Sequence, residues 1–162
     1  MNYIIKCTHF LEGDAASYFE CFIKRKTGRK KLGVVDFEHD ASTIQASARI
    51  FKIKNASTSI LLTNFEAKER GLGKKLFCRV LKTLALQGFT HILLNAVPKP
   101  DIRYDVKNAR QKLIANYRKL GFRLMDPNSG AMKATITTSV KKCNRLSTKW
   151  FDHILGLRTS VE

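Results

Sequence analysis

The sequence predicts one α/β domain with a mixed sheet, and three observations carry this prediction. The chain has 162 residues, of which 44% are hydrophobic, so it is long enough to bury a stable core without further cross-links. A strand, a glycine turn, a helix and a second strand follow one another over Ser57–Val97, which predicts a βαβ unit with parallel strands. A strong turn signal at Asp126–Gly130 then separates two further strand-like runs.

Four segments precede the βαβ unit. Asn2–Phe10 is rich in β-branched and aromatic residues, which predicts a strand. Asp14–Lys26 places its apolar residues at helical spacing, so we expect a helix with Asp14 as its N-cap. Lys31–His39 is predicted as a short strand. Ser42–Ile53 starts with apolar alternation and then slips by one residue, which predicts a strand with a bulge or bend.

The βαβ unit itself has the most regular pattern in the chain. Ser57–Phe65 is a nearly continuous apolar run, typical of a central strand covered on both faces, and Phe89–Val97 is a second buried strand. The helix between them is amphipathic and has a stop signal at Gly88. Its apolar face consists of Leu72, Leu76, Phe77, Val80, Leu81, Leu84 and Ala85.

A second helix and a hairpin complete the predicted domain. Pro98–Asp105 is predicted as a loop, and the helix after it ends at Gly121. One face of this helix is marked by Val106, Ala109, Leu113, Tyr117 and Leu120. Phe122–Met125 and Met132–Val140 are predicted as paired strands. We assign residues 1–140 to the domain and residues 141–162 to a C-terminal extension, with a short helix packed on the same domain.

The charge of the chain is strongly positive. Thirty Lys and Arg against thirteen Asp and Glu give a formal charge of +17, which attracts polyanions such as nucleotide cofactors, nucleic acids or acidic proteins. The densest patch is Lys24–Lys31. A solvated basic face that serves only solubility is the alternative, and composition does not choose between the two.

The four cysteines are far apart and lack the spacing of a metal site. We therefore expect Cys7, Cys21, Cys78 and Cys143 to be small buried hydrophobic residues of a reducing compartment. The N-terminus has no basic stretch followed by a long apolar run, and no window approaches 18 apolar residues. We expect a cytoplasmic protein that does not associate with membranes.

The glycine loop in Glu66–Phe77 (EAKERGLGKKLF) is the segment that points to chemistry. It lacks the Ser or Thr and the glycine spacing of a nucleotide P-loop, and Leu76 stands where a dinucleotide fingerprint needs its third glycine. What remains is a short turn whose backbone N–H groups, with the helix dipole and nearby cations, suit a pyrophosphate. The alternative is an ordinary tight turn between a strand and a helix.

This loop and a later motif together resemble the GNAT superfamily of N-acetyltransferases. The family's acetyl-CoA loop, [QR]-x-x-G-x-[GA], is matched by Lys68, Gly71 and Gly73, and its later L-Y-x-x-x-G-F helix end by Tyr117, Gly121 and Phe122. The order of the elements agrees from about Tyr3 to Val140, which is most of the chain. Two residues depart from the pattern: Lys68 replaces Gln or Arg and loses their planar geometry, and Asn116 replaces an apolar residue.

The resemblance implies a fold, a reaction and a set of site residues. The fold is a GNAT-like mixed sheet, splayed at its centre and flanked by helices. The reaction moves an acetyl group from acetyl-CoA to a primary amine by direct attack, without an acyl-enzyme and without a metal. The residues implied for binding acetyl-CoA are Leu62, Thr63, Asn64, Lys68, Glu69, Arg70, Gly71, Leu72, Gly73, Lys74, Lys75 and Asn108.

Tyr117 is implied as the general acid that protonates the departing thiolate, since a phenol stays protonated at neutral pH. Its alternative role is that of an amphipathic core residue. The general base is not assigned, because Ser57–Phe65 contains none of the acidic residues that many relatives carry there. The remaining candidates are Asp36, Glu38, His39, Glu66 and His91.

The acceptor is not defined by these motifs. Because coenzyme A needs only a handful of cations, the charge leaves room for an amine carried on an acidic partner, such as aminoacyl-tRNA, a ribosome-associated protein or another protein. The alternative function is a noncatalytic GNAT-like module that binds nucleic acid or coenzyme A. We expect a monomer or a homodimer.

Overall fold

A computed structural model describes residues 2–12, 16–39, 41–97 and 106–157, and its centre is one seven-stranded sheet. The order is β1-β2-β3-β4-β5-β7-β6, and all neighbours are antiparallel except the parallel pair β4–β5. The strands are β1 (Tyr3–Glu12), β2 (Ala16–Arg25), β3 (Gly33–Glu38), β4 (Ser59–Ala67), β5 (His91–Asn95), β6 (Arg123–Asp126) and β7 (Ala131–Thr135). The helices are α1 (Ala41–Ala46), α2 (Ala48–Phe51), the 3-10 turn η1 (Ala56–Thr58), α3 (Leu72–Leu86), α4 (Val106–Lys119), α5 (Ile136–Arg145) and α6 (Thr148–Ile154).

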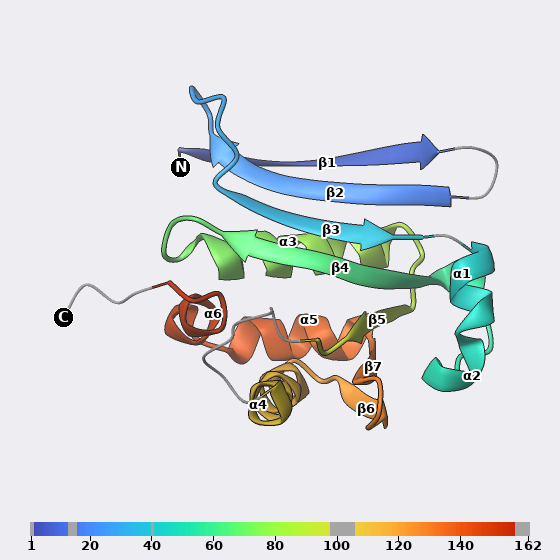
Figure 1. Cartoon of the computed structure of the whole chain (residues 1–162). Coiled ribbons are helices and arrows are strands. Elements are labelled where there is room, and N and C mark those ends of the chain that lie inside the picture. The colour runs from blue at the N-terminus through green and yellow to red at the C-terminus, as the bar shows by residue number, and fades with distance from the viewer. Residues whose placement is uncertain (1, 13–15, 40, 98–105, 158–162) are drawn as a thin grey trace.

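The predicted βαβ unit is confirmed as β4–α3–β5. The two strands are parallel neighbours, and α3 crosses behind the sheet between them (Figure 1). The helix ends beside Gly88, whose φ of +93° is incompatible with a right-handed helix. The prediction of a mixed α/β sheet flanked by helices is therefore confirmed as well.

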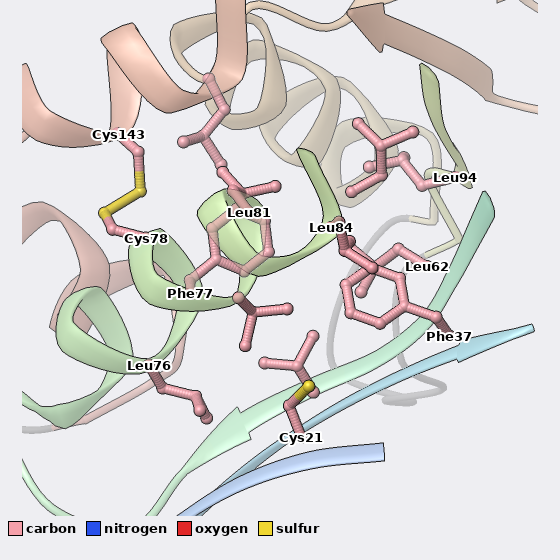
Figure 2. Packing of buried hydrophobic residues seen from close by; sticks show 14 of the residues in the cluster. Cys21, Phe37, Leu62, Leu76, Phe77, Cys78, Leu81, Leu84, Leu94 and Cys143 are labelled. Carbon is pink, nitrogen blue, oxygen red and sulfur yellow. A yellow bond between two sulfur atoms is a disulfide. The ribbon is translucent and has the colours of Figure 1, made fainter. Parts of the chain in front are cut away.

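The main core lies between the sheet and α3. Leu76, Phe77, Leu81 and Leu84 of α3 are fully or almost fully buried, in one cluster with residues of β2, β3 and β4 (Figure 2). Burying an apolar side chain of this size contributes roughly 1.5–3 kcal/mol, so this face anchors α3 firmly. The fixed helix determines where the preceding glycine loop lies.

The second predicted helix and the hairpin are also confirmed. Helix α4 places Ile114 in the main core, and β6 and β7 pair across the turn that begins at Asp126. The Asp126 carboxylate accepts hydrogen bonds from the Asn128 amide at 3.1 Å and the Ser129 hydroxyl at 2.8 Å, which closes the turn. The loop predicted at Pro98–Asp105 lies outside the described residues.

The predicted helix over Asp14–Lys26 is wrong where the structure describes it, because Ala16–Arg25 forms strand β2. Phe19, Cys21 and Ile23 alternate into the core, a spacing of two that the helical reading overlooked. Phe22 points to the other face, where the Lys31 ammonium lies 4.8 Å from its ring centre. The aromatic and β-branched content of the segment outweighed its helical spacing.

The predicted strand over Ser42–Ile53 is wrong as well, because this segment forms α1 and α2. Ile44 and Phe51, seven residues apart, are both buried on the second face of the sheet, against Leu93 and Ala131. Alternating alanines suggested a strand, but alanine is the strongest helix former. These helices cover the face of the sheet opposite α3.

The predicted strand Met132–Val140 is correct only up to Thr135. The Thr135 side chain accepts a hydrogen bond from the Thr138 amide, and this N-cap starts α5. Ile136, Ser139 and Cys143 then face the interior at helical spacing. Residue 140, where the sequence places the domain's end, lies inside α5, and the division into domain and extension stays a prediction.

The sequence predicts that the cysteines are small buried residues of a reducing compartment; Cys21, Cys78 and Cys143 are buried, but all four cysteines form disulfides. Cys7 pairs with Cys21 across β1 and β2, and Cys78 pairs with Cys143 between α3 and α5 (Figure 2). The sequence separations of 14 and 65 residues gave no signal that these residues meet. Because disulfides are rare in reducing compartments, the cysteines no longer support a cytoplasmic location, which stays a prediction.

None of the described helices has the length and apolar character that crossing a bilayer requires. Within the same residues, no cluster of three or more His, Cys, Asp or Glu side chains is placed to hold a metal ion.

The disulfide between α3 and α5 gives a first prediction. Replacing Cys78 and Cys143 together by alanine should lower the free energy of unfolding by about 4 kcal/mol, because the bond closes a 65-residue loop in the unfolded chain. Urea unfolding followed by circular dichroism measures this loss. The matched control removes Cys7 and Cys21, whose 14-residue loop predicts a smaller loss of about 3 kcal/mol. A larger loss for the control would contradict the argument.

Candidate functional site

The site begins where β4 and β5 separate. The two strands pair only over Ser59–Leu61 and His91–Leu93, although β4 continues to Ala67 (Figure 1). On its other side β4 stays paired with β3, but the register shifts so that Asp36 lies opposite Asn64 while Phe37 lies opposite Leu62. This bulge at Thr63 changes the direction of the strand. The edge of β4 that faces β5 is thereby open beyond Leu61.

A pocket of about 770 Å³ fills this opening. Its walls are Leu62–Glu66 of β4, the end of β5, one face of α4 and Ile154–Gly156 at the end of α6. The α4 residues include Asn108, Asn116 and Tyr117. The structure thus brings together Leu62, Thr63, Asn64, Asn108 and Tyr117, which the sequence placed in one site.

Tyr117 lies on the core side of α4. Its ring makes an edge contact with Phe122, with ring centres 5.7 Å apart. Burial raises the pKa of the Tyr117 phenol, so the hydroxyl carries its proton throughout the neutral range. A protonated phenol on a pocket wall can donate a proton to a leaving group, and it can equally serve as a packed core residue.

The glycine loop after Glu66 is not part of the walls of this pocket. Gly71 has a φ of +82°, which favours glycine, and it directly precedes α3. Its amide donates a hydrogen bond of 2.9 Å to the Asp152 carboxylate of α6. Leu155 covers Gly73 so closely that a Cβ built there would lie 2.4 Å from the Leu155 Cδ1 atom. The loop therefore holds an anion, and that anion belongs to the chain itself.

The charged residues of the loop are partly engaged elsewhere. The Glu69 carboxylate accepts a hydrogen bond from Arg25 at 3.0 Å and from the Tyr3 hydroxyl at 3.5 Å. The Lys74 ammonium donates to the Asn144 carbonyl at 3.5 Å, and that of Lys75 lies 5.3 Å from the Tyr3 ring centre. Lys68 and Arg70 are exposed, while Leu72 is buried in the core.

Two of the five candidate bases lie near the pocket. Glu66 is part of its wall, and Asp36 accepts a hydrogen bond of 3.2 Å from Asn64, which also lines it. Burial raises the pKa of Asp36, and the nearby carboxylates of Glu20 and Glu66 raise it further, against the lowering effect of the Asn64 hydrogen bond.

The other three candidates lie toward the paired end of β4. Glu38 is opposite Leu61. The His39 Nδ1 atom is 2.9 Å from the Ser59 carbonyl oxygen. His91 pairs in register with Ser59, and burial lowers its pKa, helped by the Lys133 charge. The paired segment Ser59–Leu61 lies between these histidines and the open edge of β4.

Sequence reasoning missed Asp152 and Leu155. The hydrogen bond between Gly71 and Asp152 joins residues 81 apart in the chain, and local patterns carry no information on such a contact. One signal was available: Asp152 is the only acidic residue in the helical segments α3 to α6. A lone carboxylate in so basic a region suggests a specific partner.

Comparisons with known proteins support the fold. No family model matches the sequence, and a search of curated proteins finds no match. Among solved structures, a CoA-dependent acyl-homoserine lactone synthase, BjaI, solved with SAM and isopentyl-CoA, has a TM-score of 0.50 at 9% identity, over 90% of this chain and 67% of that one. The acyl-homoserine lactone synthase MesI gives 0.45 at 13% identity, over 88% and 71%.

A GNAT family N-acetyltransferase, YhbS from Escherichia coli in complex with CoA, gives a TM-score of 0.46 at 14% identity. That match covers 75% of this chain and 61% of YhbS, so the chain spans about three fifths of that relative's length. At these identities the likeness extends to the fold alone. The chain adopts a GNAT-like fold.

Proposed function

We propose that the chain is an acyltransferase that moves an acyl group from a coenzyme A thioester to a primary amine. A fold alone does not select an activity, so the proposal rests on the site. The observation that carries it is the pocket between β4 and β5, where an open strand edge faces the Tyr117 phenol. We assign acetyl-CoA as the donor to test first.

The pocket suits an extended chain of amides. Backbone groups of Leu62–Asn64 on the open edge of β4 are placed to pair with such a chain, as an added strand pairs with a sheet. A volume of about 770 Å³ lies within the usual range for small-molecule sites. Asn108 and Asn116 on α4 add side-chain donors and acceptors on the facing wall.

The loop before α3 suits the diphosphate of the donor. Its amides and the positive end of the α3 dipole favour anions, and the exposed cations Lys68 and Arg70 add full charges. The Asp152 carboxylate on the Gly71 amide supports this assignment, because it is an anion held at the proposed place.

The proposed reaction follows from these positions. The amine attacks the thioester carbonyl, the C–S bond breaks, and Tyr117 protonates the departing thiolate. The proton that the attacking nitrogen loses as the amide forms restores the Tyr117 phenol. A backbone N–H of Leu62–Asn64 would stabilise the oxyanion, an effect worth a few kcal/mol in analogous sites. The substrate ammonium must first lose a proton, and we assign this step to Glu66 on the pocket wall or to Asp36, which accepts a hydrogen bond from Asn64.

The charge distribution favours a second candidate, a nucleic-acid-binding module or an enzyme whose amine is carried on nucleic acid. Helices α3 to α6 carry no acidic residue except Asp152, which is only 5% exposed. Their exposed cations include Arg79, Lys82, Lys141, Lys142, Arg145 and Lys149. Such a one-signed surface attracts a phosphate backbone without any base recognition.

Donor binding is tested at Gly71. Replacing Gly71 by Glu should abolish acetyl-CoA binding in calorimetry, because the new carboxylate would place negative charge at the diphosphate. The matched control is Gly88→Glu, at the other end of α3, where the φ of +93° resembles the +82° of Gly71. Both variants suffer the same backbone strain, of about 1–2 kcal/mol. Equal binding by both variants would contradict the assignment.

The role of Tyr117 is tested by kinetics. Tyr117→Phe should lower kcat for thiol release by about 100-fold with little change in KM, since general acids contribute at least that factor. Because burial raises the Tyr117 pKa, the acid stays protonated up to at least about pH 10, and deprotonation of this acid should lower wild-type activity only above that pH. Unchanged turnover in the Phe variant removes Tyr117 from the mechanism.

Nucleic-acid binding is tested by its salt dependence. A structured RNA should bind with an affinity that falls steeply with salt, and Arg79→Ala with Lys82→Ala should reduce the slope of log K against log salt by about 2. Filter binding between 50 and 200 mM salt measures this slope. The control removes Lys24 and Lys26, which lie at the end of β2 and just after it rather than on these helices. A slope that changes equally in both variants would show that only net charge acts.

A further inference from the structure

Helix α6 and the turn after it lie across the glycine loop. Three contacts define this arrangement: Asp152 on the Gly71 amide, the Thr148 methyl group near Gly71, and Leu155 over Gly73. Leu155 also lines the pocket, so the same short segment borders both the pocket and the loop. A donor that used both places at once would have to pass this segment.

The Asp152 contact is a buried charge rather than a surface contact. The side chain belongs to a residue that is 5% exposed, and its carboxylate accepts the Gly71 hydrogen bond at 2.9 Å. Burying a carboxylate is costly unless a donor or a dipole compensates it, and here the start of α3 provides both. This is the environment that a phosphate of the donor would need.

Leu155 adds a steric barrier to the electrostatic one. Its Cδ1 atom lies so close to Gly73 that even a Cβ there would approach it to 2.4 Å. A group that approached Gly73 from the side of its missing Cβ would meet this methyl group. Rotating the Asp152 side chain alone would therefore not open the loop.

We propose that α6 is an internal plug in which the Asp152 carboxylate takes the place of a donor phosphate. The inference rests on the proposed function and adds regulation to the same site: the described structure is the closed state, and the donor binds when the segment Asp152–Leu157 leaves the loop. A diphosphate carries more negative charge than one carboxylate, so it competes effectively for the same amides.

The structure divides α6 into an anchored and a releasable part. Phe151 is fully buried and packs on Phe65 and Phe77, with ring centres 6.5 and 6.2 Å apart. Beyond it, Ile154 is only partly buried against the main core, and the last turn is closed by backbone bonds such as that from the Leu157 amide to the Asp152 carbonyl at 2.9 Å. A helix of seven residues is marginal without tertiary contacts, so its end can open while Phe151 stays in place.

Trp150 lowers the cost of opening. Its Nε1 atom is buried and has no hydrogen-bond partner among the described residues. A buried donor without an acceptor is unfavourable, and opening of the adjacent segment Asp152–Leu157 would let water reach this atom and remove the penalty while Phe151 stays in place. Trp150 is also the one tryptophan of the sequence, so its fluorescence reports on α6 alone.

The test compares wild-type protein with Asp152→Asn by calorimetry, using coenzyme A and inorganic pyrophosphate as separate probes. The substitution keeps the size of the side chain and removes its charge. We expect both probes to bind about five- to tenfold more tightly to the variant, since a hydrogen bond to a charged group is stronger than one to a neutral group by about that factor. Asp126→Asn, in the β6–β7 turn, is the matched control with the same change of charge.

Two further measurements complete the test. Leu155→Ala removes the steric barrier without changing charge and should also tighten binding, which covers the case that Asp152→Asn does not fold. In wild-type protein, Trp150 emission should shift to longer wavelength as coenzyme A saturates the site.

The outcomes separate this inference from the proposed function. If both variants bind pyrophosphate more tightly and no protein binds coenzyme A, α6 acts as a plug, but coenzyme A is not the donor. If all proteins bind coenzyme A with equal affinity and Trp150 emission does not change, coenzyme A remains the donor, but α6 is not a plug. Equal affinity for both probes in wild type and variants overturns the plug whatever the donor is.

Discussion

The end of the parallel pairing between β4 and β5 is the constraint on which the site depends. The strands can be parallel only because α3 crosses over between them, and the buried face of α3 fixes where its first turn lies. Since pairing stops after Leu61, the rest of β4 presents unpaired backbone to a pocket instead of to a neighbouring strand. One topological fact thus produces both the open edge and the anion-holding turn.

The sequence predicted the elements whose patterns are long and regular. The β4–α3–β5 unit and α4 repeat apolar residues over several turns, so local spacing determines them. The prediction failed where the same residues fit both a helical and a strand periodicity. Phe19 and Ile23 suit a helix by their spacing, but pairing with β1 and β3 makes that segment a strand. Thr135 is the N-cap of α5, but the β-branched residues around it favoured the prediction of a strand.

The candidate site was predictable in its parts but not in its assembly. Leu62–Asn64 and Tyr117 were placed in one site because motif order carries topology, and the structure places them around one pocket. The Asp152–Gly71 bond and both disulfides depend on tertiary contacts between distant segments, which no local pattern encodes. Because of these contacts, the amide of Gly71 in the loop is already bonded to a carboxylate of the chain and is not free for a ligand.

The Cys78–Cys143 disulfide has a consequence for how strongly the loop is occupied. It ties α3, whose start carries the loop, to α5, and only a few residues separate Cys143 from α6. The carboxylate is therefore a tethered competitor whose effective concentration at the loop is on the order of millimolar, as for short linkers generally. Weakly binding phosphates at low concentration would not displace this carboxylate. A ligand would displace it only if it made further contacts along β4.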